Sequence, residues 1–149
     1  MGEVIAHPRL GAAALVFDDH ERILLGQRGK EPHRGQWILP GGGVREHETL
    51  SEAIARELRQ EAGIEVTLEG VIDIVDIMDA GDERRLVVYF RARLRSGRVE
   101  AASDLLDARF FTSTAVEVLV RDGRVTPTVA EVLRKHVLDA RSALDAVGR

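Results

Sequence analysis

Hydrophobic and polar positions along this chain follow two different periods, so the pattern predicts both strands and helices. Short apolar runs rich in strand-forming residues predict β-strands over residues 10–17, 22–27, 37–40, 66–78, 85–94 and 108–111. The polar turn Asp18-Asp19-His20-Glu21 joins the first two runs and predicts a hairpin. Polar and apolar residues alternate late in the fifth run, so the sheet should have one wetter face there.

The clearest helix is predicted between a run of glycines and Gly63. Its apolar stripe repeats every fourth residue, at Leu50, Ile54 and Leu58. Thr49 followed by Glu52 is the pattern of a capping box, in which each side chain satisfies a backbone N–H at the start of a helix. Gly63 can adopt the left-handed conformation that ends a helix. The segment is therefore expected to be a short amphipathic helix with one buried face.

Two further helices are expected toward the end of the chain. Thr114 with Glu117 predicts the cap of a brief helix that ends at Gly123. Pro127 suits the first turn of the next helix. One face of that helix would carry Val129, Leu133, His136, Ala140, Leu144 and Val147. Strands and helices in this order indicate the α/β class, with a mixed sheet and helices packed against it.

The composition excludes several classes of protein. A length of 149 residues suggests a single domain over residues 1–149. The absence of cysteine excludes disulfides and thiolate metal sites and fits a reducing cytoplasm. There is no apolar run of about 18 residues and no basic N-terminus followed by an apolar stretch, so we expect neither a membrane span nor a signal peptide. The net charge of −4 and the few aromatic residues argue against nucleic-acid binding.

Candidate chemistry is concentrated around the predicted helix that follows the glycines. Glu57 and Glu61 lie four residues apart and project from nearly the same line of the helix surface. On the helical wheel they face the loop formed by Gly41 to Gly43 and not the apolar stripe. Two such carboxylates repel each other unless a cation lies between them, and hard oxygen ligands suit Mg²⁺ or Mn²⁺. The alternative is an ordinary acidic helix face that only meets water.

The full spacing of this segment favours the metal site. Residues 42–64 resemble the signature of the Nudix hydrolases: a glycine, five residues, a glutamate, seven residues, then Arg-Glu-aliphatic-x-Glu-Glu-x-Gly-aliphatic. The positions in register are Gly42, Glu48, Arg56, Glu57, Leu58, Glu61, Gly63 and Ile64. One position departs, because Gln60 replaces the first glutamate of the Glu-Glu pair. The strand predicted at residues 37–40 supplies the strand-loop-helix context of the family. The resemblance implies a Nudix-type α/β/α sandwich.

The resemblance also implies roles for individual residues. Glu57 would bind the metal ion and assist proton removal, Glu61 would be a second metal ligand, and the carbonyl of Gly41 would approach the same ion. Arg56 would orient the glutamates with support from Glu48, although a purely structural salt bridge between the two is equally open. Contacts to substrate phosphate are expected from Arg28, Gly42 and Gly43. For Arg28, an ordinary role at the surface is equally open.

Gln60 bears directly on the metal site. An amide can coordinate a metal through its oxygen but carries no charge, so metal binding is expected to be weaker, or fewer ions to be held without substrate. The alternative is that this position contributes little and another carboxylate substitutes for it. Glu100 and Asp104, just before the last predicted strand, are the candidates, and a solvated loop charge is the competing interpretation for each.

The function implied by the resemblance is metal-dependent hydrolysis of a phosphoanhydride by attack of water at phosphorus. The substrate would be a small nucleoside diphosphate derivative such as ADP-ribose or a (d)NTP. A hydrolase of the GDP-mannose type is one alternative, although the Arg56-Glu57 pair argues against it. A catalytically weak nucleotide sensor is the other, and Gln60 is the feature in its favour. No nucleic-acid or membrane partner is expected, and the family favours a homodimer.

Overall fold

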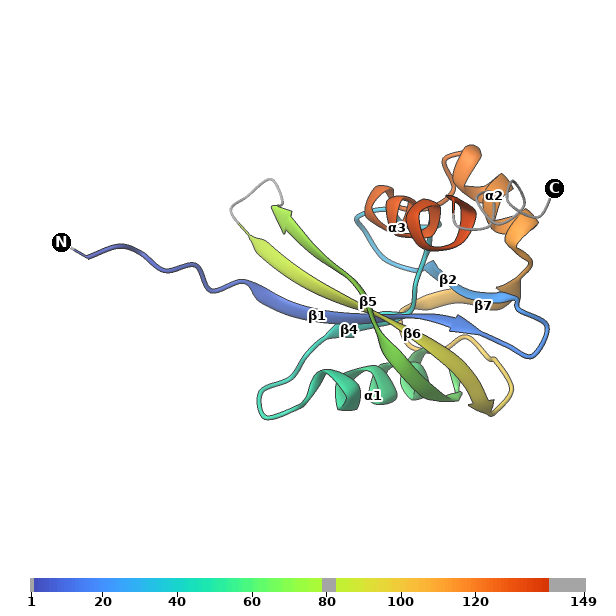
Figure 1. Cartoon of the computed structure of the whole chain (residues 1–149), viewed down its shortest axis with the longest axis horizontal. Helices are drawn as coiled ribbons and strands as arrows, with labels where there is room; N and C mark the ends of the chain where they lie inside the picture. Colours follow the sequence, from blue (N-terminus) through green and yellow to red (C-terminus); the bar gives the residue numbers. More distant parts are fainter. Residues whose placement is uncertain (1, 79–82, 140–149) are drawn as a thin grey trace.

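The computed structural model describes residues 2–78 and 83–139 (Figure 1). The strands are β1 (Arg9–Phe17), β2 (Ile23–Arg28), β3 (Trp37–Ile38), β4 (Gly41–Gly43), β5 (Glu65–Met78), β6 (Arg84–Ser96) and β7 (Leu105–Phe111). The helices are α1 (Leu50–Ala62), α2 (Ser113–Arg121) and α3 (Pro127–Leu133), and α3 continues into a π-helical turn, η1 (Arg134–Leu138). The sheet has the order β3-β2-β1-β6-β5, with β4 paired to β1 and β7 paired to β2.

The sheet is mixed because one long pairing is parallel. β1 runs parallel to β6 from Arg9 opposite Arg85 to Phe17 opposite Arg93. All other pairings between named strands are antiparallel, including the long β5–β6 pair and the β1–β2 pair, so the hairpin predicted at the turn after Phe17 is confirmed. β2 meets β1 only near the turn and then pairs with β3 and β7. The two halves of the sheet therefore diverge beside the first part of β1.

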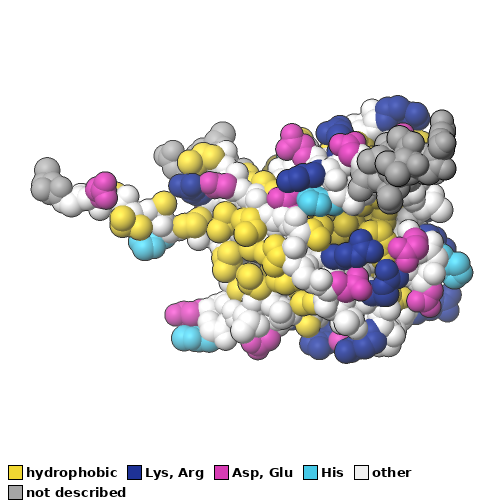
Figure 2. Space-filling view, in the orientation of Figure 1, with side chains coloured by type: hydrophobic (Ala, Val, Ile, Leu, Met, Phe, Trp, Pro, Cys, Tyr) yellow, Lys and Arg dark blue, Asp and Glu magenta, His cyan; other side chains and the backbone are white. Residues whose placement is uncertain are grey.

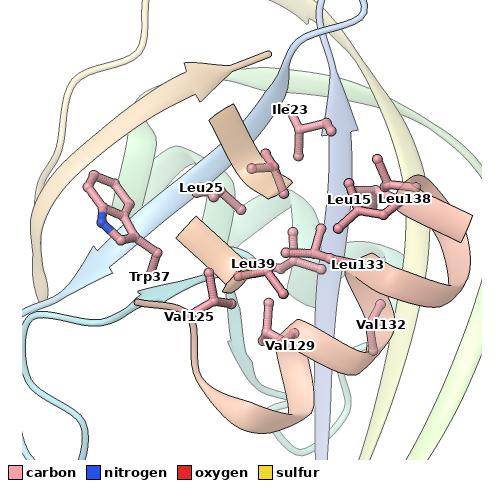
Figure 3. Packing of buried hydrophobic residues seen from close by; sticks show 14 of the residues in the cluster. Leu15, Ile23, Leu25, Trp37, Leu39, Val125, Val129, Val132, Leu133 and Leu138 are labelled. Atoms are coloured by element: carbon pink, nitrogen blue, oxygen red, sulfur yellow. The ribbon is translucent and has the colours of Figure 1, made fainter. Parts of the chain in front are cut away.

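Two hydrophobic cores lie on opposite faces of this sheet. α1 covers one face, and α2 and α3 lie on the other, as Figure 1 shows. The core under α1 includes Ile54, Leu58 and Val88. The core under α2 and α3 includes Leu15, Leu39, Val129 and Leu133, which gather in Figure 3, with Leu25 and Trp37 at its edge. These layers confirm the expected α/β fold and its arrangement of a sheet between helices.

The glycine run differs from the expectation. Gly41 to Gly43 form a short strand, β4, and not a loop, and they pair with Gly11 to Ala13 of β1. A side chain at Gly41 would meet the carbonyl oxygen of Ala12 at 2.2 Å. The absence of a side chain at Gly41 is therefore what lets this segment approach β1 closely enough to pair.

The boundaries of the last elements also differ from the expectation. β7 begins at Leu105, because it pairs with β2 as far as Arg28. The N-cap of α2 is Thr112, whose side chain accepts a hydrogen bond from the backbone N–H of Ala115, so the cap predicted at Thr114 was wrong. The helix from Pro127 carries the predicted face at the buried Val129 and Leu133 and at the half-buried His136. The remaining predicted positions, Ala140, Leu144 and Val147, lie outside the described residues.

Candidate active site

The helix that carries the candidate acids forms for the reasons visible in its sequence. The side chain of Thr49 accepts a hydrogen bond from the N–H of Glu52, and the Glu52 carboxylate accepts one from the N–H of Thr49. Gly63 ends the helix in the left-handed conformation, with φ of 69°. The buried face of α1 includes Ile54 and Leu58 and packs on the sheet. The predicted capping box and glycine cap are confirmed, and this packing turns the next face of the helix toward β4.

Glu57 and Glu61 face the glycine strand, as predicted. The backbone N–H of Gly41 donates a hydrogen bond to the Glu61 carboxylate at 3.2 Å. The Glu57 carboxylate lies against Gly42 so closely that a Cβ on Gly42 would be 2.6 Å from its Oε1 atom. Glycine at position 42 therefore lets the helix and the strand approach until the two carboxylates lie close together beside β4.

The protonation of Glu61 reflects this crowding. The side chain is buried, with 9% of the residue exposed. Burial, followed by the charge of Glu57, raises the pKa of Glu61 to about 8, and the more distant Asp104 adds to the effect. The hydrogen bond from Gly41 opposes this rise without cancelling it. Without a metal ion, Glu61 therefore holds a proton near neutral pH.

Arg56 organises the groups around the pair. Its guanidinium donates two hydrogen bonds to Glu48, at 2.8 and 2.9 Å, and one to Glu57 at 2.7 Å. It also donates to the carbonyl oxygen of Gly43 at 3.0 Å. The bidentate contact holds the pKa of Glu48 well below its usual value, at about 2, and the same contacts raise that of Arg56. Arg56 thus ties the helix to the glycine strand and fixes the position of the Glu57 carboxylate.

The three candidates for an additional metal ligand differ in their distance from the acid pair and in their contacts. Gln60 is exposed, and its side-chain oxygen is 3.4 Å from Arg56, so the amide is turned toward the guanidinium. Asp104 lies close enough to Glu61 to affect its pKa, and it forms a salt bridge of 3.0 Å with Lys30. Glu100 is exposed, and no contact joins its side chain to the acid pair in the described structure. Asp104 is therefore the better placed of the two extra carboxylates.

A cleft of about 920 Å³ opens on the other side of the glycine strand. Its lining includes Gly41 to Gly43 of β4 and Arg28 at the end of β2, which places three predicted substrate contacts on its wall. The positive side chains on this lining are Arg9, Arg28, Lys30 and Arg85. Apolar side chains, including Leu39, Val87 and Val129, form much of the rest. An anionic group with an apolar extension fits this combination of charge and surface.

Comparison with known proteins identifies this arrangement. The family model described as NUDIX domain matches residues 7–135. The chain belongs to the Nudix hydrolase family. The signature helix, the glycine strand and the mixed sheet between helices are this family's arrangement, and the expected enzyme class is confirmed at that level.

Individual Nudix relatives carry several names. The low-salt glycan biosynthesis protein Agl8 of Haloferax volcanii is 32% identical over 104 residues, which are 65% of this chain and 67% of that protein. The ADP-ribose pyrophosphatase of Methanocaldococcus jannaschii is 28% identical over 106 residues, 70% of this chain and 62% of its own length. The 8-oxo-dGTP diphosphatase of Proteus vulgaris is 38% identical over 65 residues, 43% of this chain and 58% of its own length. The chain therefore spans about three fifths to two thirds of these relatives.

Solved structures agree with the fold. The MutT NUDIX hydrolase of Burkholderia pseudomallei has a TM-score of 0.66 and 30% identity, covering 73% of this chain and 86% of that one. A NUDIX hydrolase of Nitrosomonas europaea has a TM-score of 0.74 at 23% identity, covering 88% of this chain and 70% of that one, and supports the fold alone.

Among residues 2–78 and 83–139, every helix is too short or too polar to span a membrane.

Several cleft residues were not found from the sequence. Arg9, Arg85 and Tyr89 line the cleft from β1 and β6, far from the signature segment. For Arg85 and Tyr89 the sequence signal was the alternation of polar and apolar residues along β6, which indicated a wetter face of the sheet but not the cleft beside it; Arg9 on β1 had no such signal. The parallel pairing of β1 with β6 brings Arg9 next to Arg85, and a sequence pattern does not specify that pairing.

Proposed function

We propose that this Nudix protein hydrolyses a phosphoanhydride bond in a small nucleoside diphosphate derivative, using Mg²⁺ or Mn²⁺ and attack of water at phosphorus. The observation that carries the proposal is the pair Glu57 and Glu61, packed against β4 beside a cleft lined with arginine and lysine. A phosphoanhydride is shielded by its own negative oxygens, so its hydrolysis needs both charge neutralisation and a positioned nucleophile.

The residues present fit a divalent ion. Glu57 and Glu61 offer carboxylate oxygens that crowd each other, and a divalent cation would relieve their repulsion better than a proton does. Within the described residues no group of three or more acidic or histidine side chains is arranged to hold a metal. Such a sparse set suits Mg²⁺, which keeps several waters and binds through one or two carboxylates together with substrate phosphates. The bound ion would lower the pKa of a water and offset phosphate charge.

The other residues would position the reactants. Arg56 holds the Glu57 carboxylate in place, so Glu57 can accept a proton from the attacking water in a fixed geometry. Glu48 neutralises Arg56 and limits its movement. Arg28 on the cleft wall would bind phosphate oxygens, with Gly42 and Gly43 allowing close approach of the backbone. Gln60 and the carbonyl of Gly41 remain proposed ligands, and Asp104 is the proposed extra carboxylate.

The substrates favoured by this site are ADP-ribose-like compounds and (d)NTPs. Relatives named as an ADP-ribose pyrophosphatase and an 8-oxo-dGTP diphosphatase support both classes. A panel of ADP-ribose, the common NTPs and dNTPs and GDP-mannose, with Mg²⁺ or Mn²⁺ and identification of the products, tests the proposal. Release of a nucleoside monophosphate that depends on metal supports it. Hydrolysis of GDP-mannose to GDP and mannose would support the alternative that attacks carbon.

A nucleotide sensor without turnover is the second candidate. Two features favour it: the uncharged Gln60 is turned toward Arg56, and residues 2–78 and 83–139 contain no group of three acidic or histidine side chains arranged to hold a metal. Glu57→Gln separates the two, because it should remove turnover more than nucleotide binding in an enzyme. If no substrate in the panel is hydrolysed while nucleotides with metal still raise the unfolding temperature, the sensor is the correct assignment.

We also propose a homodimer in which β5 pairs with its symmetry equivalent. β5 is an edge strand of the sheet, and it exposes Val71, Ile74 and Met78. Each of its acidic residues forms an ion pair within the chain, with partners that include Arg59, Arg91, His136 and Arg84, which removes charge repulsion between two such edges. In Figure 2 hydrophobic side chains also gather on the visible face near the start of β1. Light scattering of the protein and of Ile74→Lys tests the dimer, and a monomeric parent chain would refute it.

A further inference from the structure

Tyr89 occupies a particular place in the cleft. It lies on β6, opposite Ala13 of β1, and Ala13 in turn lies opposite Gly41 of β4. Across the sheet this row continues to Asp73 of β5. Neighbouring strands are about 4.8 Å apart, so the Tyr89 backbone is about 10 Å from that of Gly41, beside the acid pair. One row of residues therefore joins the candidate metal site to Tyr89.

The tyrosine is enclosed, yet its hydroxyl lacks a partner. Only 4% of the residue is exposed, and it belongs both to the core under α3 and to the lining of the cleft. Across residues 2–78 and 83–139, no hydrogen bond to the Tyr89 hydroxyl is formed. The neighbouring Asp73 carboxylate is occupied by His136 at 2.9 Å and by the N–H of Ile74 at 2.9 Å. The hydroxyl oxygen is open to the cleft, so it can form a hydrogen bond with a ligand that binds there.

The surroundings of Tyr89 indicate what that ligand would present. Along the row, Ala13 and Gly41 have little or no side chain, which leaves space in the cleft beside Tyr89. Val87 and Val129 also line the cleft and are apolar. Burial is the main reason that the pKa of Tyr89 rises to about 12, so its hydroxyl stays neutral and can donate a hydrogen bond. A neutral, partly apolar group with a hydrogen-bond acceptor matches this part of the cleft better than a phosphate does.

We propose that the Tyr89 hydroxyl is a specificity determinant that hydrogen-bonds a neutral group of the nucleoside while the acid pair holds the phosphates. This inference rests on the proposed function and extends it from the phosphates to the rest of the substrate. The group is either an acceptor on the base or a hydroxyl of the sugar, which have the same hydrogen-bonding chemistry. A donor on the wall of a cleft is covered when a ligand binds, so a ligand that leaves this donor unpaired is disfavoured and one hydroxyl can discriminate between otherwise similar nucleotides.

The test is Tyr89→Phe, which removes one oxygen and keeps the ring in the core. We would measure kcat/KM with Mg²⁺ for ATP, GTP, CTP, UTP and the deoxy form of the best of them, and the inhibition constant of inorganic pyrophosphate. The best nucleotide should lose about tenfold in kcat/KM, mainly through KM, and inhibition by pyrophosphate should not change. If the ratio between bases shrinks, the contact is to the base; if the ratio between ribose and deoxyribose shrinks, it is to the sugar. Thr114→Val removes an exposed hydroxyl from α2 and is the matched control.

The outcomes separate this inference from the proposed function. If the parent chain hydrolyses nucleotides but Tyr89→Phe keeps every kcat/KM ratio within about twofold, the inference is overturned and the function stands. If the parent chain hydrolyses none of them, the proposed function fails, and the same comparison is made by calorimetric titration of the nucleotides with Mg²⁺. In that titration, equal dissociation constants for the parent and Tyr89→Phe, or no binding to either, would overturn the inference. A change in unfolding temperature without a change in selectivity would mean that the hydroxyl only supports packing.

Discussion

Glu61 is buried and forms no ion pair with any described residue, and this makes the stability of the metal-free protein depend on pH. The folded-state pKa of Glu61 is about 8, above the ordinary value of 4.5. The folded protein therefore holds a proton on Glu61 that the unfolded chain releases. The stability that comes from this proton is fully present below the unfolded pKa and is lost as pH rises through the folded pKa. Folding should thus weaken between about pH 5 and about pH 8 when no metal is bound.

The magnitude follows from the size of the pKa change. The rise from 4.5 to about 8 corresponds to about 5 kcal/mol, since each pKa unit is worth about 1.4 kcal/mol. Between about pH 6 and about pH 9 the loss should be about 3 kcal/mol. For a chain of this size that is a fall of about 10 °C in unfolding temperature. Glu61→Gln, in which a neutral amide replaces the protonated acid, should remove most of this dependence and should be the more stable protein at about pH 9.

The assay is urea unfolding with a chelator at several pH values, followed by the same series with Mg²⁺. Glu131→Gln, the same change at an exposed site on α3, is the matched control and should behave like the parent chain. Mg²⁺ should restore the stability of the parent at high pH, because the ion would replace the proton beside the carboxylates, and it should raise the stability of Glu61→Gln far less. If Glu61→Gln and the parent lose stability equally as pH rises, the burial argument is wrong. If Mg²⁺ stabilises both equally, Glu61 is not a ligand.

Three further predictions concern the groups around the pair. Gly42→Ala should lower kcat about 100-fold in steady-state kinetics, since its Cβ would displace the Glu57 carboxylate. The control Gly43→Ala should lose far less activity, because its Cβ meets open space. Arg56→Lys should abolish the bidentate contact that lowers the pKa of Glu48. The stability that this contact gives is present above pH 4.5 and is lost as the pH falls toward about 2, so acid unfolding should begin at a higher pH in the variant. Gln60→Glu should lower the half-saturating Mg²⁺ concentration about tenfold, as measured by activity titration, and an unchanged value would mean that this position contributes little.

Much of the site could be predicted because it is local in sequence. Residues 42–64 contain the helix, its caps and both acids, and a helix fixes the relative positions of groups four residues apart. The direction in which Glu57 and Glu61 point follows from the apolar stripe, because burying Ile54 and Leu58 leaves the acids only one orientation relative to β4. The fold class was accessible for the same reason, since strand and helix periods are properties of short segments.

The remainder depends on contacts between distant segments. The glycine strand forms because β1 offers it a partner, and three consecutive glycines have no strand propensity of their own. Arg85 and Tyr89 reach the cleft because β6 pairs in parallel with β1, a register that depends on the whole sheet. The cap at Thr112 was mistaken for Thr114 because both lie ahead of apolar residues with similar spacing, and only the extent of β7 decides where α2 begins.

Gln60 fits this site when the charges are counted around it. Arg56 offsets the charge of Glu48, which leaves Glu57 and Glu61 as the two negative charges near β4 once the proton on Glu61 departs. One divalent ion would neutralise that pair, so the buried end of α1 would then carry no net charge. A glutamate in place of Gln60 would add a third negative charge beside Arg56, whose guanidinium already bonds Glu48 and Glu57. We therefore expect the amide to favour a site that binds one ion before substrate and acquires further positive charge only when phosphates enter the cleft.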